Sequence, residues 1–269
     1  MSFLAGVDFT DCPEIPLFPL VHTSNSLDGK AYLETGKIPK PNKPCEAFPE
    51  DNPVYLFYGK PAYRETIELT SFNGSTPMVF IFKDDPNIRK NIIRMYPCDT
   101  GAHYGRIYEG YTIQKDWDFK RFKIDFEMGN DINLLPLHVV LFFGSNENYY
   151  NLEPAPMRKK IPLNNANNAF LELIESKKFE KFDDRCGVVE VQSEEIDTLL
   201  ERLLFVFAPY SAISHNMKSK LDAKGITVEL YEPAGQRTRF MEYYFKCFDA
   251  VREYYRSDDN KYLKAMKLK

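Results

Sequence analysis

Prolines divide the first 53 residues into short apolar pieces, and this spacing restricts the fold more than any other feature. The eight are Pro13, Pro16, Pro19, Pro39, Pro41, Pro44, Pro49 and Pro53. Because proline lacks a backbone donor and clashes inside a helix, no long helix fits this region. We expect a strand at 17–22, a short helix at 26–35 ended by Gly36, and a loop at 37–51.

Short β-branched or aromatic runs alternate with helical patterns over the rest of the chain. Strands are expected at 54–58, 77–82, 137–143, 188–191, 203–208 and 226–231, and helices at 86–94, 164–177, 211–224 and 238–256. A turn is expected around Gly101, and a turn with a short helix within 193–204. In 238–256 the apolar residues recur at helical spacing, which indicates a helix packed on a sheet. The mixture predicts an α+β fold.

Size and composition indicate a globular protein. The chain has 269 residues, 43% of them hydrophobic, with 17 Tyr and 21 Phe, which excludes global disorder. Its length fits one α+β domain with insertions or two small domains. The formal net charge of −4 gives no global basic field for nucleic acid. Local basic runs at 158–160 and 261–269 are the candidate patches, and such runs are usually solvated surface.

The cysteines indicate a reducing compartment. All five lie far apart, with no C-x-x-C pair and no His at zinc spacing, so we expect free thiols and no metal site. No signal sequence and no apolar run of about 18 residues occurs, so we expect a cytoplasmic protein without a membrane segment.

Three separated segments carry the candidate chemistry. His22 and Thr23 follow an apolar run, the block 55–64 is rich in aromatic residues, and Glu190 lies within the sequence Val-Val-Glu-Val-Gln of 188–192. Each has a structural alternative. A lone His after a strand is often a core or edge residue, and tyrosines are abundant enough here to be core. Glu190 could simply alternate outward from an edge strand.

The order and context of these segments resemble the ADP-ribosyltransferase superfamily, in the branch whose histidine, tyrosine and glutamate are shared by diphtheria-type toxins, poly-ADP-ribose polymerases and DNA-modifying bacterial toxins. The resemblance rests on 19–23 with the helix and Gly36 turn after it, on 57–63, and on 189–192 with the strand at 203–208. It implies a split, mostly antiparallel sheet with surrounding helices and an NAD cleft between the halves.

The resemblance also implies site roles. His22 would bind the ribose hydroxyls of NAD, and Thr23 or its backbone would orient the nicotinamide amide. Tyr63, with Tyr58 as second candidate, would stack on the nicotinamide ring. These four residues would form most of the NAD site.

Two further roles concern charge. Arg64 would bind a phosphate of NAD through its planar fork of donors. Glu190 would bind the ribose hydroxyl next to the reacting carbon and stabilise the oxocarbenium-like transition state. One carboxylate suffices because the leaving group, the nicotinamide ring, is already cationic in NAD. A glycosidase, in contrast, needs a second carboxyl group as an acid to protonate its leaving oxygen. Glu194 and Glu195 are weaker alternatives in a turn.

The chain departs from the family at two points. Little of 65–187 resembles the family. In arginine-specific relatives a Glu or Gln lies two residues before the catalytic glutamate, but here that position is Val188, and Gln192 lies two residues after it. Transfer to arginine is therefore disfavoured.

Other chemistries lack their motifs. Neither a phosphate-binding loop nor G-x-G-x-x-G occurs. His103 with Asp99 and Glu109 offers a weak metal or nuclease site, His138 and His215 are isolated, with His138 read as structural, and Ser211 and Ser214 have no nucleophile elbow.

We therefore expect a single ADP-ribosyltransferase-like domain over 1–269 with an insertion around 84–180. NAD would be the substrate, and ADP-ribose would pass to a nucleic acid or protein. By analogy the protein would be a bacterial toxin or antiviral effector, and a neutralising antitoxin could be its partner. An NAD glycohydrolase, a catalytically inactive relative that binds a ligand or partner, and a binding or structural module unrelated to NAD are the alternatives.

Overall fold

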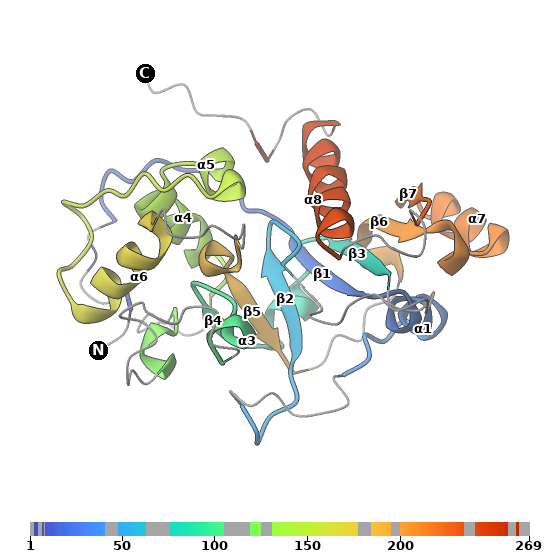
Figure 1. The fold of residues 1–269 in the computed structure, drawn as a ribbon, viewed down its shortest axis with the longest axis horizontal. Helices are drawn as coiled ribbons and strands as arrows, with labels where there is room; N and C mark the ends of the chain where they lie inside the picture. Colours follow the sequence, from blue (N-terminus) through green and yellow to red (C-terminus); the bar gives the residue numbers. More distant parts are fainter. Residues whose placement is uncertain are drawn as a thin grey trace.

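An open seven-stranded sheet flanked by eight helices forms the described part of the chain (Figure 1). The computed structural model describes residues 3–4, 7, 9–40, 48–62, 76–104, 119–124, 131–176, 184–194, 200–233, 240–257 and 262–263. The strand order is β4-β5-β2-β1-β3-β6-β7, and every neighbouring pair is antiparallel except β6 and β7. The expected α+β class with a mostly antiparallel sheet is confirmed.

The elements have the following bounds. The strands are β1 (Leu20–Asn25), β2 (Val54–Tyr58), β3 (Pro77–Phe82), β4 (Ile92–Tyr96), β5 (Glu190–Ser193), β6 (Leu203–Pro209) and β7 (Thr227–Tyr231). The helices are α1 (Ser26–Thr35), α2 (Pro86–Arg89), α3 (Thr100–Tyr104), α4 (Leu134–Phe143), α5 (Asn146–Asn151), α6 (Asn165–Glu175), α7 (His215–Ala223) and α8 (Phe240–Ser257).

The two central strands, β1 and β2, pair only at one end. Their register contains Leu20 opposite Tyr58 and Val21 opposite Phe57. Beyond Val21, β1 continues along β3 as far as Asn25, and β2 pairs along its length with β5. The sheet therefore forks between β1 and β2, one residue before His22.

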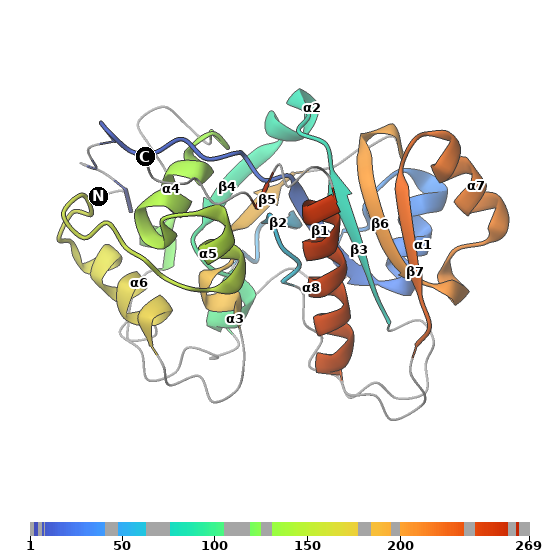
Figure 2. The same cartoon turned by 90° about the horizontal axis from the view of Figure 1, so that it is seen from above.

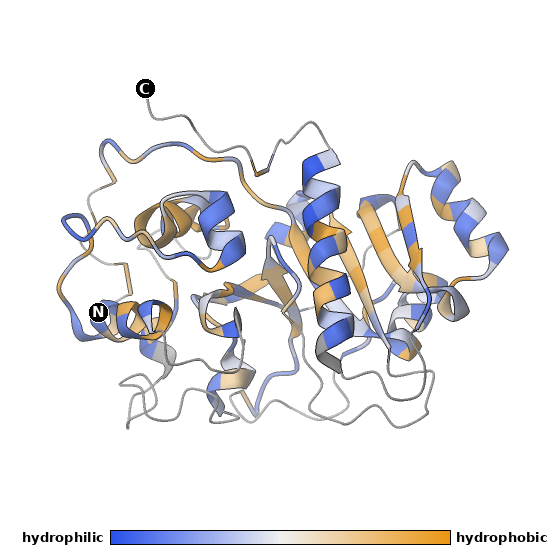
Figure 3. Cartoon of the chain, turned by 45° about the horizontal axis from the view of Figure 1, so that its top comes forward, coloured by the Kyte–Doolittle hydropathy of each residue, from blue (hydrophilic) through white to orange (hydrophobic). Residues whose placement is uncertain are grey.

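Helices cover both faces of the sheet on the β1-β3-β6 side. Figures 1 and 2 show α8 on one face and α1 on the other. Figure 3 shows hydrophobic strands and mixed colouring along α8. This helix buries one stripe of side chains, comprising Tyr243, Tyr244, Cys247, Ala250, Val251 and Tyr255. The helical spacing of apolar residues in the sequence is thus the spacing of this buried face.

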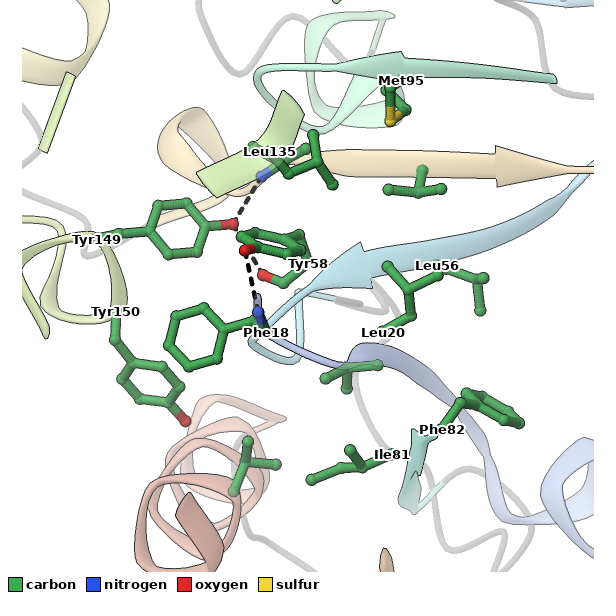
Figure 4. Close-up of a cluster of buried hydrophobic side chains, with 14 of the residues drawn as sticks. Phe18, Leu20, Leu56, Tyr58, Ile81, Phe82, Met95, Leu135, Tyr149 and Tyr150 are labelled. Carbon is green, nitrogen blue, oxygen red and sulfur yellow. Dashed lines mark hydrogen bonds between the residues drawn. The ribbon is translucent and has the colours of Figure 1, made fainter. Parts of the chain in front are cut away.

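An aromatic cluster ties β2 and β5 to α5 (Figure 4). The Tyr149 hydroxyl donates to the Tyr58 carbonyl oxygen at 2.8 Å and accepts from Val189 N at 3.0 Å. The Tyr58 hydroxyl in turn accepts from Phe18 N at 3.0 Å. These buried bonds connect the start of β5, and hence Glu190, to the hydrophobic core.

One predicted strand is a helix. Residues 137–143 belong to α4, and every residue from His138 to Phe143 is buried. A helix that is apolar all round has no polar stripe, so its sequence reads like a buried strand. Gly144, with φ of 75°, caps the helix in the left-handed conformation.

Other differences are local. The helix expected at 86–94 is the four-residue α2 followed by strand β4, and α5 was not predicted. The turn expected around Gly101 is helix α3. The strand expected at 188–191 is β5, which begins at Glu190. No helix in the described part of the chain is long and apolar enough to cross a bilayer.

Candidate functional site

His22 lies on β1 at the fork of the sheet and contacts the strands on both sides, β2 and β3. Its Nδ1 lies 2.9 Å from the Tyr55 carbonyl oxygen on β2. Its ring is near parallel to that of Phe80 on β3, with centroids 6.4 Å apart. Because a carbonyl oxygen only accepts, Nδ1 carries the proton and Nε2 of the neutral ring is an acceptor. Burial lowers the pKa of His22, which favours this neutral form.

Two hydroxyls follow His22 along β1. Thr23 and Ser24 are buried, and neither Thr23 Oγ1 nor Ser24 Oγ has a hydrogen-bond partner among the described residues. Buried polar atoms are nearly always bonded, so unpartnered ones beside His22 are candidate ligand contacts.

Glu190 is the first residue of β5, which lies between β4 and β2. Its side chain is 1% exposed, so the interpretation that it alternates outward to solvent from an edge strand is wrong. Oε1 accepts from Thr100 Oγ1 at 2.8 Å and from Gln192 Nε2 at 2.6 Å, and Oε2 accepts from Thr100 N at 3.0 Å. The carboxyl group is thus enclosed by hydrogen-bond donors.

The environment of Glu190 opposes its ionisation. Burial, followed by the nearby charge of Asp99, raises its pKa to about 8, while the bonds from Gln192 and Thr100 act in the opposite direction. Asp99 itself accepts at Oδ1 from Ala102 N at 2.9 Å, at the start of α3. Strongly shifted carboxyls of this kind are enriched at functional sites.

A polar chain runs from Glu190 to the surface. Arg94 Nε donates to Gln192 Oε1 at 2.5 Å, and an Arg94 terminal nitrogen pairs with Asp51 Oδ2 at 2.6 Å. The Arg94 guanidinium also lies 3.9 Å from the ring centroid of Phe48. The side chain of Asp51 is 47% exposed, so the chain ends in solvent.

The structure separates the other predicted residues. Tyr58 is fully buried in the core, where its ring packs against Phe18 and Tyr149. Its hydroxyl accepts a hydrogen bond from Phe18 N. Tyr63 and Arg64 lie outside the described residues. His22 and Thr23 lie beside the fork, and Glu190 lies across β2 from them.

Lys60, within the aromatic block, is fully buried. Its Nζ donates to the carbonyl oxygens of Tyr149 at 3.0 Å and Tyr150 at 3.4 Å in the last turn of α5. A cation there complements the helix dipole. We therefore assign Lys60 a structural contact between β2 and α5.

Sequence reasoning missed Thr100 and Arg94. Thr100 donates to Glu190 across 90 residues of sequence and Arg94 donates to Gln192 across 98, and nothing local marks either residue. The alternation of Glu190 and Gln192, two polar residues on one strand face among valines, was the only available signal.

The structure places two of the weaker candidates in helices. His103 lies in α3, and His138 sits in α4 among the rings of Phe3, Phe142, Phe143 and Phe170, where burial lowers its pKa to about 3. Within the described ranges no group of three His, Cys, Asp or Glu side chains could hold a metal ion.

A hollow of about 320 Å³ lies at the opposite end of β5. It is lined by Lys40, Glu50, Asp51, Asn52, Pro53, Ile93 and Glu194, and neither His22 nor Glu190 contributes to it. It shares Asp51 with the polar chain that leads from Glu190.

Together these residues offer a neutral imidazole acceptor and a carboxyl group on opposite sides of one strand. A carboxylate can stabilise developing positive charge, and an imidazole can accept from a hydroxyl. No protein-family model, curated protein or solved structure matches the chain.

Proposed function

We propose that the protein is an NAD-dependent ADP-ribosyltransferase, with His22 and Glu190 in its active site. The observation that carries the proposal is that β2 alone separates the two residues. His22 bonds to the backbone of Tyr55, and Tyr55 pairs with Gln192 two residues from Glu190. Two strand spacings amount to about 10 Å between the backbones of β1 and β5. The register places Glu190 on the face of Phe57 and Val21, and His22 follows Val21, so a ligand that reaches both side chains would pass through the fork, beyond the last paired residues of β1 and β2.

The fork supports the finer fold proposal. We propose that the fork between β1 and β2 corresponds to the split that the resemblance implies, with an NAD cleft opening there. The unpartnered hydroxyls of Thr23 and Ser24 lie on the diverging part of β1. They would bind polar groups of the ligand, such as the nicotinamide amide.

In the proposed mechanism His22 accepts a hydrogen bond from a ribose hydroxyl through Nε2. Glu190 then faces the reacting ribose, where its negative charge stabilises the oxocarbenium-like transition state as nicotinamide leaves. The cationic nicotinamide ring favours ionised Glu190, because a nearby positive charge lowers the pKa of a carboxyl. Access to Glu190 requires its contacts with Thr100 to open. Tyr63 and Arg64 remain the proposed residues for stacking and phosphate binding.

Macromolecules are the proposed acceptors, nucleic acid or protein, and the proposed setting is a cytoplasmic bacterial toxin or antiviral effector with a neutralising partner. These proposals rest on the resemblance. No metal is needed, since the leaving group carries its own positive charge before cleavage.

Incubation with labelled NAD and a cell lysate tests the proposal. We expect wild-type protein to release nicotinamide and to label nuclease- or protease-sensitive material, and Glu190→Gln to do neither. Glu194→Gln is the matched control, because Glu194 is exposed at the far end of β5. Circular dichroism verifies that each variant is folded.

Each outcome has a distinct meaning. Nicotinamide release without labelling assigns NAD hydrolysis instead of transfer. Binding of NAD without release assigns an inactive relative. If wild-type protein shows neither release nor a rise in melting temperature with NAD, the proposed function is wrong.

A further inference from the structure

Glu190 and Gln192 share one face of β5 with two residues of the neighbouring strand β4. Residues two apart on a strand point to the same side, and the register pairs Tyr96 with Glu190 and Arg94 with Gln192. These four side chains therefore form a contiguous row. Gln192 is fully buried within it.

Arg94 fixes the orientation of the Gln192 amide. An arginine side chain has donors only, so the group that faces Arg94 Nε at 2.5 Å must be the amide oxygen. The amide nitrogen then points to Glu190 Oε1, at 2.6 Å. A reversed amide would place donor against donor at Arg94 and oxygen against oxygen at Glu190.

Arg94 is itself held at two points. Asp51 pairs with its guanidinium, and the ring of Phe48 lies against the guanidinium plane. The arginine side chain is only 17% exposed. Its position, and with it the orientation of Gln192, is therefore set by the fold rather than by solvent.

We propose that Gln192, oriented by Arg94, is a positioning residue that holds the Glu190 carboxylate in the orientation required for reaction. This inference rests on the proposed function. Gln192 touches Glu190 and would not touch the substrate. Without Gln192, Thr100 would be the remaining hydrogen-bond donor to the Glu190 carboxyl group among the described residues.

Among the described residues, four charged or titratable groups face Glu190 or Gln192. Asp99, before α3, opposes ionisation of Glu190, and Tyr96 is the cross-strand neighbour of Glu190 on β4. Arg94 on β4 and Tyr55 on β2 are the cross-strand neighbours of Gln192. Gln192 acts against Asp99 by donating to the carboxylate. Loss of Gln192 should therefore make Glu190 harder to ionise.

The test measures Glu190 titration without any substrate. The free energy of unfolding is measured as a function of pH for the wild type, Gln192→Met and Arg94→Met. Each protein is compared with the same protein that also carries Glu190→Gln. In both variants we expect the titration of Glu190 to move upward by about one pH unit, a tenfold change in proton affinity. Arg89→Met is the matched control, because Arg89 pairs with Asp84 on the surface away from Glu190.

An unchanged titration in Gln192→Met, or equal shifts in Arg94→Met and Arg89→Met, would overturn the proposal. If Gln192→Met does not fold, Arg94→Lys serves in its place, with a smaller upward shift expected because lysine lacks the planar fork.

Activity gives the second readout. In Gln192→Met we expect kcat for nicotinamide release to fall while KM changes less. We also expect the pH profile of nicotinamide release to be displaced to higher pH. If Gln192→Met kept full activity with an unshifted pH profile, the positioning role of Gln192 would be refuted. If the wild type consumes no NAD while the titration still shifts, the proposed function fails, and the role of Gln192 in orienting Glu190 stands.

Discussion

His22 Nδ1 lies 2.9 Å from the carbonyl oxygen of Tyr55, just beyond the last paired residues of β1 and β2. A side chain thus satisfies a backbone acceptor of the neighbouring strand at the point where the ladder has ended. The bond fixes the tautomer of His22 and leaves Nε2 to accept from a ligand.

His22→Ala should weaken NAD binding about tenfold, the value of one hydrogen bond at roughly 1.4 kcal/mol. Since the pKa of His22 is lowered from 6.5, the neutral ring persists above that pH, and its contribution should not vary there. Titration calorimetry at pH 7 measures the change. His215→Ala, at the start of α7, is the control, and an equal loss in both variants would argue against a contact from His22.

Tyr149→Phe should destabilise the protein by about 1–3 kcal/mol, because it leaves Val189 N and the Tyr58 carbonyl oxygen buried without their partner. Urea denaturation measures this value. Tyr150→Phe, which removes the hydrogen bond to the Phe248 carbonyl oxygen, should cost less. If both substitutions lowered the free energy of unfolding equally, the link that the Tyr149 hydroxyl makes between β2 and β5 would not be important for stability.

His138→Phe should remove an acid-dependent loss of stability. Burial lowers the pKa of His138 from 6.5 to about 3, so between these values the unfolded chain binds a proton that the folded chain does not. His138 therefore contributes stability above pH 6.5 that is lost as pH falls, by up to about 1.4 kcal/mol per pH unit. Denaturant titrations from pH 4 to 7 should show a shallower slope in the variant, and a parallel slope would disprove the assignment.

Gly59→Ala should cost at least about 2 kcal/mol, for two physical reasons. Gly59 has φ of 73°, and an added Cβ would lie 2.7 Å from the ring of Phe18. Gly225 has nearly the same φ, 72°, but nothing within 4 Å of its added Cβ. Gly225→Ala should therefore cost only the backbone strain, and thermal melts that show equal effects would exclude the packing contribution at Gly59.

The sequence by itself determined those elements whose signals are local. Helix α1 starts after Asn25, whose side chain accepts from Asp28 N, and ends at Gly36 in the left-handed conformation. The strand at 54–58 was predicted with the bounds of β2, and α8 follows its apolar periodicity. In each case the deciding interactions lie within one element or at its ends.

Tertiary structure alone decided the rest. The residues of α4 are apolar on all sides, so only their burial among neighbours distinguishes helix from strand. The sequence marked Glu190 as unusual but did not distinguish a solvated edge from an enclosed carboxyl group. That distinction depends on β4 and α3, whose Arg94 and Thr100 reach β5 across about 90 residues or more. Long-range pairings of this kind leave no local pattern, because each residue's role exists only once the strands are adjacent.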